Sequence, residues 1–506
     1  MDWQNPSPMA TTKTLRDLVF RPDAAAAEPL YVQLARALTE AIRSGRIAIG
    51  SRLPSERDYA RAAGLSRTTV TAAYQELKAL GLLRGYVGRG AVVIADDPDR
   101  AAAGAIAWTQ LASRRAPRPL AAGAGTAPGL ISFSDGWLHP SLVPQASLST
   151  AAARLMQGSE LLSRAAPLCG LPVLREALLG ALRAGGVKAT TEEVLVTSGA
   201  QQGLNVLARA LLAPGDTVLC ETPTWYGAVR AFRAAGAEVV GIGMDHEGVD
   251  PDALEDALLR TRPKFVYLMP GFQCPTGRLL SLARRRRILQ IGGRHRTPIV
   301  ESHVYGELAF GERLPSLKSL DTAGIVIHQG SASKAISPAL RLGWLVAPAA
   351  AQELFVAAKT SLDLSTPSLT QAILAAFMAT GEYARHLTAF RSALRGRRDA
   401  LIAALAQHCP ELRYARPEGG LYLWVRLPRR LAARDFEAAA AAAGVAVRNG
   451  DVFQVDAGVS DHIRLCYAAP PLDEIVPGVQ RMARALRSAL HHQRQSEGPA
   501  SALASV

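Results

Sequence analysis

Two hydrophobic patterns divide the chain. Near the N-terminus, Tyr31, Leu34, Leu38 and Ile42 recur at helical spacing, which predicts an amphipathic helix with one apolar stripe. From Ile131 onward, short apolar segments alternate with amphipathic ones, and this alternation is typical of an α/β domain with a mostly parallel sheet. The pattern therefore predicts a small helical domain followed by a large α/β domain.

Serines and glycines predict where two further N-terminal helices begin and end. Ser55 is suited to cap one helix, Gly64 to end it, and Ser66 to cap the next. In this third helix Arg67, Thr68 and Thr71 should point away from the core, near the end that a recognition helix places in a DNA groove. The residues expected to face the core are Val70, Ala73, Tyr74, Leu77 and Leu80.

Composition sets the expected domain boundaries. The segment 82–94 is β-prone around its glycines, as a short two-stranded wing would be. Residues 95–129 are dominated by Ala, Pro, Gly and Arg, which is typical of a flexible linker. We therefore expect a helical domain with a wing at 28–94, a linker at 95–129, and the α/β domain at 130–490.

Charge is compatible with a nucleic-acid partner. The formal net charge of the 506 residues is +14, and residues 28–94 contain ten Lys and Arg against five Asp and Glu. Such an excess favours binding to phosphates, which dominate non-specific affinity for DNA. The genomic base composition that favours Ala and Arg explains the overall charge equally well. A three-helix bundle with a solvated basic face fits the N-terminal pattern equally well.

Cysteines and apolar runs restrict the setting. The five cysteines lie far apart without a C-x-x-C pair, which argues against a disulfide framework or zinc site, so no metal is expected. The N-terminus lacks the basic start and apolar core of a signal peptide, and no uninterrupted apolar run reaches the length of about 18 residues that spans a membrane. We expect a cytoplasmic protein without a membrane partner.

Two segments of the α/β domain carry candidate chemistry. After the predicted strand 193–197, Gly199 and Ala200 open a helix whose free N–H groups can bind an anion, although many such turns bind nothing. After the predicted strand 325–328, Lys334 follows small hydroxyl residues and precedes Arg341. Such a lysine can form a Schiff base with an aldehyde cofactor whose phosphate the hydroxyls and arginine bind. A solvated surface lysine is the ordinary alternative.

The N-terminal segment resembles the winged helix-turn-helix of the GntR regulator family over the whole of 28–94. The resemblance implies a double-stranded DNA partner, with Arg67 reading bases and Ser55 and Ser66 binding phosphates at helix N-termini. It rests on Pro29-Leu30-Tyr31, Leu53-Pro54-Ser55-Glu56-Arg57, Leu65-Ser66-Arg67-Thr68-Thr69-Val70 and Gly88-Arg89-Gly90. The residues that would meet DNA are Ser55, Arg57, Ser66, Arg67, Thr68, Thr69, Gly88 and Gly90.

Residues 131–490 resemble fold-type I, pyridoxal 5'-phosphate-dependent aminotransferases with a large and a small domain. Joined to a GntR-type head, they resemble the MocR/GabR subfamily of regulators. This resemblance implies a homodimer in which an amine or amino acid reacts with the bound cofactor and changes how the dimer holds DNA. It rests on Thr197-Ser198-Gly199-Ala200-Gln201-Gln202, Pro275-Thr276-Gly277, Ser331-Ala332-Ser333-Lys334, Pro338-Ala339-Leu340-Arg341-Leu342-Gly343 and Ile463-Arg464-Leu465.

The resemblance also assigns roles in the site. Lys334 would form the internal aldimine with the cofactor, and Tyr305 would hydrogen-bond its phenolic oxygen. Trp225 would stack on the pyridine ring, or simply pack in the core. Arg464 would bind an effector carboxylate, or form a surface salt bridge. The phosphate would be held by Gly199, Ala200, Ser331 and Arg341.

Three positions depart from the aminotransferase pattern. Ser302 stands where a carboxylate keeps the pyridine nitrogen protonated, and a hydroxyl can only hydrogen-bond that nitrogen. Cys274 replaces the usual asparagine, and Ala165 replaces a tyrosine that reaches the phosphate across the dimer. We therefore expect weak or absent transaminase activity and a regulatory function. A working aminotransferase and a dimer whose domain has lost the cofactor are the alternatives.

Overall fold

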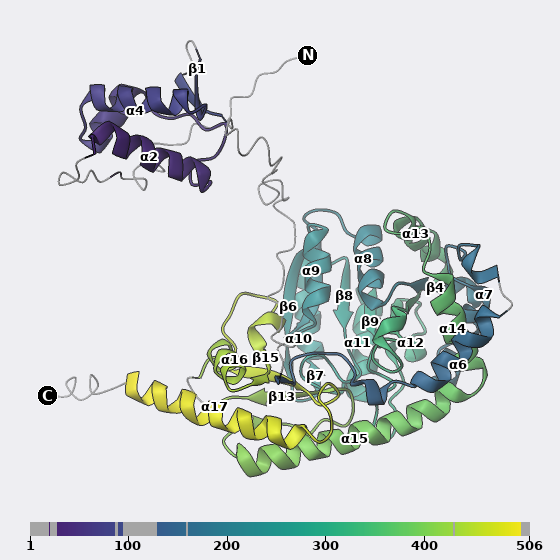
Figure 1. Ribbon diagram of the computed structural model, residues 1–506. Coiled ribbons are helices and arrows are strands. Elements are labelled where there is room, and N and C mark those ends of the chain that lie inside the picture. The colour runs from purple at the N-terminus through teal and green to yellow at the C-terminus, as the bar shows by residue number, and fades with distance from the viewer. Residues whose placement is uncertain are drawn as a thin grey trace. The chain divides into compact units, whose positions relative to one another are not determined.

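The computed structural model describes residues 20, 28–86, 90–94, 129–157, 160–428 and 431–496. The chain divides into two compact units, 1–114 and 115–506, which are described separately (Figure 1). The expected linker 95–129, apart from Gly129, and the wing residue Gly88 lie outside the described residues. No helix in the described ranges is long and apolar enough to cross a membrane.

The N-terminal unit contains the three predicted helices and the wing. Ser55 and Ser66 cap the second and third helices, because their hydroxyls accept hydrogen bonds from the backbone N–H groups of Asp58 and Thr69. The second helix ends at Gly64, whose φ of 66° suits a residue without a Cβ. The elements are α2 (Leu30–Arg43), α3 (Glu56–Ala63), α4 (Arg67–Ala79) and the antiparallel strands β1 (Leu83–Tyr86) and β2 (Gly90–Val93).

The core of this unit corrects three sequence predictions. Tyr31 and Leu80 were expected in the core but are 39% and 46% exposed. Tyr31 lies in the first turn of α2, and Leu80 follows the last residue of α4. Each therefore lacks a full helical turn on one side that would shield it from solvent. Thr71, expected to point away, donates its hydroxyl proton to Glu56 across 2.8 Å and so links α4 to α3.

The large domain of the C-terminal unit is built on one sheet. Strands β5, β6, β8, β9 and β10 run parallel, whereas β4, β11 and β7 pair antiparallel towards the sheet edges, so the mostly parallel prediction is confirmed. The order is β4-β11-β10-β9-β8-β5-β6-β7. The strands are β4 (Val194–Thr197), β5 (Thr217–Thr222), β6 (Glu238–Asp245), β7 (Gly248–Val249), β8 (Phe265–Leu268), β9 (Ile299–Ser302), β10 (Val326–Ser331) and β11 (Gly343–Val346).

Helices connect and cover these strands (Figure 1). Strands β4, β8, β9 and β10 are buried along their whole length, as expected where helices cover both faces of a parallel sheet. The helices of the large domain are α6 (Gln145–Met156), α7 (Pro172–Ala184), α8 (Ala200–Leu211), α9 (Tyr226–Ala234), α10 (Pro251–Thr261), α11 (Leu282–Arg294), α12 (Leu317–Leu320), α13 (Ala349–Thr360) and α14 (Ser368–Ala379).

A smaller domain follows the large one, and it also includes strand β3, which precedes the large domain in the sequence. The main sheet of this domain is antiparallel and has the strand order β12-β13-β16-β15. Strand β3 pairs with β14. Helices α15 and α17 pack together, and α17 extends to Ser496, beyond the expected domain end at 490 (Figure 1). The elements are β3 (Ile131–Ser132), α15 (Glu382–His408), β12 (Arg413–Tyr414), β13 (Tyr422–Arg426), α16 (Ala433–Ala442), β14 (Val445–Ala446), β15 (Arg448–Asn449), β16 (His462–Cys466) and α17 (Ile475–Ser496).

Candidate functional site

A cavity of about 330 Å³ lies where the strands of the large domain end and meet the small domain. Ser302 ends β9 and Ser331 ends β10, and because these strands are parallel neighbours their carboxyl ends open at the same edge. The sequence-predicted residues that line this one cavity are Ala200, Trp225, Ser302, Tyr305, Ser331, Lys334, Arg341 and Arg464. Gly199 lies directly beside it, against Arg341.

One end of the cavity has the donors that a phosphate requires. Gly199 is the N-cap of α8 and no side chain caps this helix, so its first amides are available to an anion. A Cβ on Gly199 would lie 2.8 Å from Nη2 of Arg341, so only glycine lets the guanidinium approach this closely. Arg341 also donates to the Ser333 hydroxyl across 3.3 Å. Helix amides and a guanidinium together suit a phosphate dianion. The hydroxyl of Ser331 lines the same cavity, and in this structure it donates to the carbonyl oxygen of Leu342 across 3.2 Å.

Lys334 lines the same cavity. Its Nζ donates to the carbonyl oxygen of Gly136 across 2.6 Å and lies 4.7 Å from the ring centroid of Trp137. Burial disfavours the charged ammonium and lowers the pKa of Lys334 to about 8. A substantial neutral fraction at physiological pH makes this amine a nucleophile, which the ordinary alternative of a solvated surface lysine would not be.

The walls between Lys334 and the sheet suit an aromatic ring. Trp225 lines one side of the cavity, and Ser302 and Tyr305 line the end of β9. The Tyr305 hydroxyl lies 3.1 Å from that of Tyr422, and burial raises its pKa, so it stays protonated and can donate a hydrogen bond. Ser302 presents its hydroxyl at the end of β9, where the resemblance places a carboxylate, and Tyr267 also lines the cavity.

Arg464 also lines the cavity and is 3% exposed, so the alternative of a surface salt bridge is wrong. It donates to the carbonyl oxygen of Ser134 across 2.6 Å, and its guanidinium carbon lies 4.3 Å from the ring centroid of Tyr422. Its Nε has no hydrogen-bond partner among the described residues. A buried guanidinium with an unused donor is suited to a ligand carboxylate.

The other two departures from the family pattern differ in their surroundings. Cys274 is buried and its Sγ lies 3.6 Å from Arg464, and burial raises the pKa of its thiol, so it stays neutral. It therefore offers Arg464 no counter-charge. Ala165 is exposed and does not line the cavity within this subunit.

Several lining residues were missed by the sequence analysis. Tyr422, Tyr267 and Arg448 lie near or in the cavity, but no local motif surrounds them. Their position follows from strand pairing: Arg448 on β15 lies directly opposite Arg464 on β16. Only the strand register could have revealed this placement, and the register was not predictable from the local sequence.

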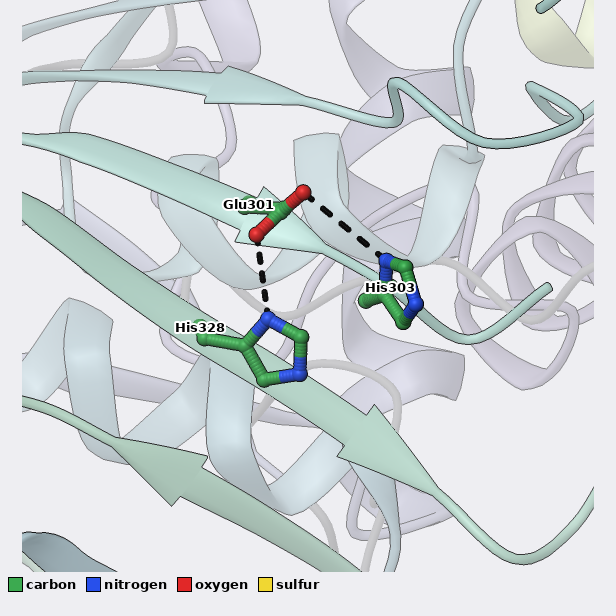
Figure 2. Close-up of side chains that lie close together, drawn as sticks. All are labelled: Glu301, His303 and His328. Atoms are coloured by element: carbon green, nitrogen blue, oxygen red, sulfur yellow. Dashed lines mark hydrogen bonds and ion pairs between the residues drawn. The ribbon is translucent and has the colours of Figure 1, made fainter. Parts of the chain in front are cut away.

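A buried cluster lies on the other side of β9 from the cavity. Figure 2 shows His303 and His328 turning their Nδ1 atoms towards the carboxylate of Glu301, at 3.8 and 3.0 Å. These three residues present possible metal ligands within 4.8 Å of one another. However, both carboxylate oxygens already accept hydrogen bonds from the backbone N–H groups of Leu317 and Lys318. We therefore interpret Glu301, His328 and the two amides as a hydrogen-bonded support for β9, whereas the Nδ1 of His303 has no hydrogen-bond partner among the described residues.

Six of the predicted DNA-contacting residues, Ser55, Arg57, Ser66, Arg67, Thr68 and Thr69, lie at the starts of α3 and α4. The side chains of Arg57, Arg67 and Thr68 are exposed. The hydroxyl of Ser66 lies 2.7 Å from that of Thr69, and the hydroxyl of Ser55 donates to the carboxylate of Asp58 across 2.6 Å. Both serines are therefore engaged in helix capping, and Gly90 begins β2.

Known families match both units. The aminotransferase class I and II family matches residues 141–482, and the gntR family of bacterial regulatory proteins matches residues 30–93. The chain is 38% identical to 2-aminoadipate transaminase of Thermus thermophilus, over 72% of this chain and 91% of that protein. It is 32% identical to the probable rhizopine catabolism regulatory protein MocR of Rhizobium meliloti, over 80% and 83% of the two chains.

Two further comparisons extend these matches. The HTH-type transcriptional regulator TauR of Rhodobacter capsulatus is 32% identical over 90% of this chain and 96% of its own length. The crystal structure of LysN, an α-aminoadipate aminotransferase from Thermus thermophilus complexed with N-(5'-phosphopyridoxyl)-L-leucine, superposes with a TM-score of 0.72. It is 36% identical and covers 76% of this chain and all of that one.

Proposed function

This chain belongs to the MocR/GabR-type subfamily of GntR transcriptional regulators, and from that premise we propose that it binds DNA under the control of an amine or amino acid. The effector would enter the cavity of the aminotransferase-like domain. Pyridoxal phosphate would be its cofactor there, and the winged helix-turn-helix would bind the operator.

The observation that carries this proposal is the meeting of three groups in one cavity: an amine of lowered pKa, a phosphate site and a buried arginine. Lys334 would bind the cofactor, Arg341 and the amides of α8 would hold its phosphate, and Arg464 would orient an effector carboxylate. When bound, pyridoxal phosphate supplies an aldehyde with which lysine and effector amines can react in turn.

Ser302 favours regulation over turnover. A hydroxyl hydrogen-bonds a ring nitrogen without the charge that would hold a proton there, so proton abstraction from an amino acid should be slow. Reversible amine exchange does not require that proton. The similarity to 2-aminoadipate transaminase favours a working aminotransferase as the second candidate, and accumulation of a keto acid would distinguish it.

The DNA-binding end also belongs to the proposal. Arg67 would read bases from the start of α4, which suits a helix whose N-terminal residues enter the major groove. Aminotransferase domains of this fold form dimers that share their sites, so we propose a homodimer bound to paired half-sites. A protein with this partner would work in the cytoplasm.

Borohydride trapping tests the proposal. Purified full-length protein is incubated with pyridoxal phosphate, reduced and digested, and the modified peptide is identified by mass spectrometry. The expected product carries the cofactor on Lys334, and the Lys334→Ala variant should show no modification of that peptide. A protein that stays colourless, or that is labelled only at exposed lysines such as Lys264, would contradict the proposal.

A further inference from the structure

The cavity contains one cationic side chain more than the cofactor and an α-carboxylate have been assigned. Its lining has four cationic side chains and the single carboxylate of Asp135. In the proposed function Lys334 binds the cofactor, Arg341 serves the phosphate, and Arg464 serves the α-carboxylate of an amino acid. Arg448 is the remaining cation and has no role so far.

Arg448 is held beside Arg464 by the small sheet. The two residues are directly paired in the antiparallel register of β15 and β16, so their side chains leave the same face. Directly opposed residues have Cβ atoms about 4.5–5.5 Å apart, which brings both guanidinium groups within reach of one small ligand. Both also line the cavity.

The two arginines differ in how their charges are compensated. The guanidinium of Arg464 donates a hydrogen bond to the carbonyl oxygen of Ser134 and packs against the ring of Tyr422. Arg448 is half-buried, and its guanidinium makes no hydrogen bond or ion pair within the part of the chain that the structure describes. The nearby carboxylate of Glu437 accepts a hydrogen bond from the side-chain amide of the neighbouring Asn449.

An unpaired guanidinium opposite a second one has an electrostatic cost. Like charges directly opposite one another destabilise a strand pair, and partial burial reduces the screening that water provides. An anion that enters the cavity removes this cost. The planar fork of arginine matches a carboxylate, which can accept two parallel hydrogen bonds.

We propose that Arg448 binds a carboxylate on the side chain of the effector, so that the effector class is the acidic amino acids. This inference rests on the proposed function, and it adds the class of effector side chain that the cavity would select. Arg464 would hold the α-carboxylate while Arg448, beside it on the sheet, would hold the distal one.

Matched pairs of amino acids test this inference on the cofactor-loaded, full-length protein. Glutamate is compared with glutamine, and aspartate with asparagine, because each pair has nearly the same shape and differs in side-chain charge. Apparent affinity is read from the change in cofactor absorbance during titration. The acidic member should bind roughly 10- to 100-fold more tightly, as expected for a hydrogen-bonded ion pair.

Three variants assign the preference to Arg448. Arg448→Gln should remove the acid-over-amide preference while leaving cofactor absorbance unchanged, and Arg448→Lys should retain part of it. Arg209→Gln, which removes the same charge from the exposed surface of α8, should leave the preference intact. Circular dichroism of each variant checks that it has folded.

The possible failures are distinguishable. Equal or tighter binding of the amides by the wild-type protein would overturn the acidic class while leaving the proposed function standing. An equal loss for all four amino acids in Arg448→Gln would overturn it as well, because both arginines would then share the α-carboxylate. If no amine changes the absorbance of the loaded protein, the proposed function fails and this inference fails with it.

Discussion

At the scale of the residue, Lys334 links burial to reactivity. Its Nζ lies inside a cavity, against Trp137, and burial lowers its pKa to about 8. Roughly a tenth of the amine is then neutral at pH 7, compared with well under a hundredth for an ordinary lysine. Only the neutral amine attacks an aldehyde, so this shift favours the cofactor capture that we propose for Lys334.

The pH dependence of cofactor capture follows from this pKa. The depressed value means that the amine loses its proton as pH rises through about 8. The initial rate at which cofactor-free protein takes up pyridoxal phosphate should therefore rise about tenfold per pH unit below that value and level off above it. Stopped-flow absorbance measures the rate. A rate that keeps rising to pH 10 would indicate an ordinary, solvated lysine.

Ser302 is the residue that should set the balance between regulation and turnover. Ser302→Asp restores a carboxylate at the end of β9, where it would hold a proton on the cofactor ring. Transamination with a keto acid should rise by roughly tenfold or more, equivalent to about 1.4 kcal/mol of barrier. Ser302→Asn serves as the control because it adds bulk without charge. Equal rates for wild type and Ser302→Asp would contradict this role.

At the scale of the element, the start of α8 is the proposed phosphate site. Gly199 has a φ of 88° and lies against Arg341, so Gly199→Ala should both strain the backbone and displace the guanidinium. Affinity for pyridoxal phosphate should fall roughly tenfold or more. Gly215→Ala is the matched control, because φ is 91° there and no atom lies near the added Cβ.

The two glycine variants separate strain from site geometry. Each should lower the free energy of unfolding by about 1–3 kcal/mol, since alanine disfavours positive φ. Cofactor affinity, measured by absorbance titration, should fall only for Gly199→Ala. Similar affinities for both variants would place the phosphate elsewhere.

Helix α4 is the element proposed to read DNA. Arg67 is exposed at its first turn, and Ser66 caps it. Arg67→Ala should weaken binding to the native operator by about 1–3 kcal/mol in a fluorescence anisotropy titration. Arg36→Ala removes an exposed charge from α2 and should have a smaller effect. Equal losses of operator affinity for the two variants would indicate that Arg67 contributes only non-specific electrostatic attraction to DNA.

Local patterns in the sequence predicted some elements well and others poorly. Features that depend on neighbouring residues are found in the structure as expected. They are the helix caps at Ser55 and Ser66, the strand before Gly199, and the segment with Lys334 after β10. Periodicity does not reveal where coverage by other helices stops, so the exposure of Leu80 was missed. The position of Arg448 depends on the register of β15 with β16, which only tertiary packing fixes.

At the scale of the whole molecule, the proposed DNA-binding and effector sites lie on separate compact units. If an effector changes the affinity for DNA, then DNA must change the affinity for the effector by the same factor, because binding free energies are linked. A typical coupling of about 1–3 kcal/mol corresponds to a change of roughly 5- to 150-fold. Under the proposed function, effector binding in the cavity and DNA binding by helix α4 would therefore be linked, and the linkage can be measured from either site.

Operator binding before and after borohydride reduction tests the central claim most directly. Reduction fixes the cofactor to Lys334, so an amine can no longer take the place of the lysine. We predict that an effector amino acid shifts the operator affinity of untreated protein at least fivefold, and that the reduced protein binds the same operator without any shift. An equal shift in the reduced protein would show that the effector acts elsewhere and would contradict the account.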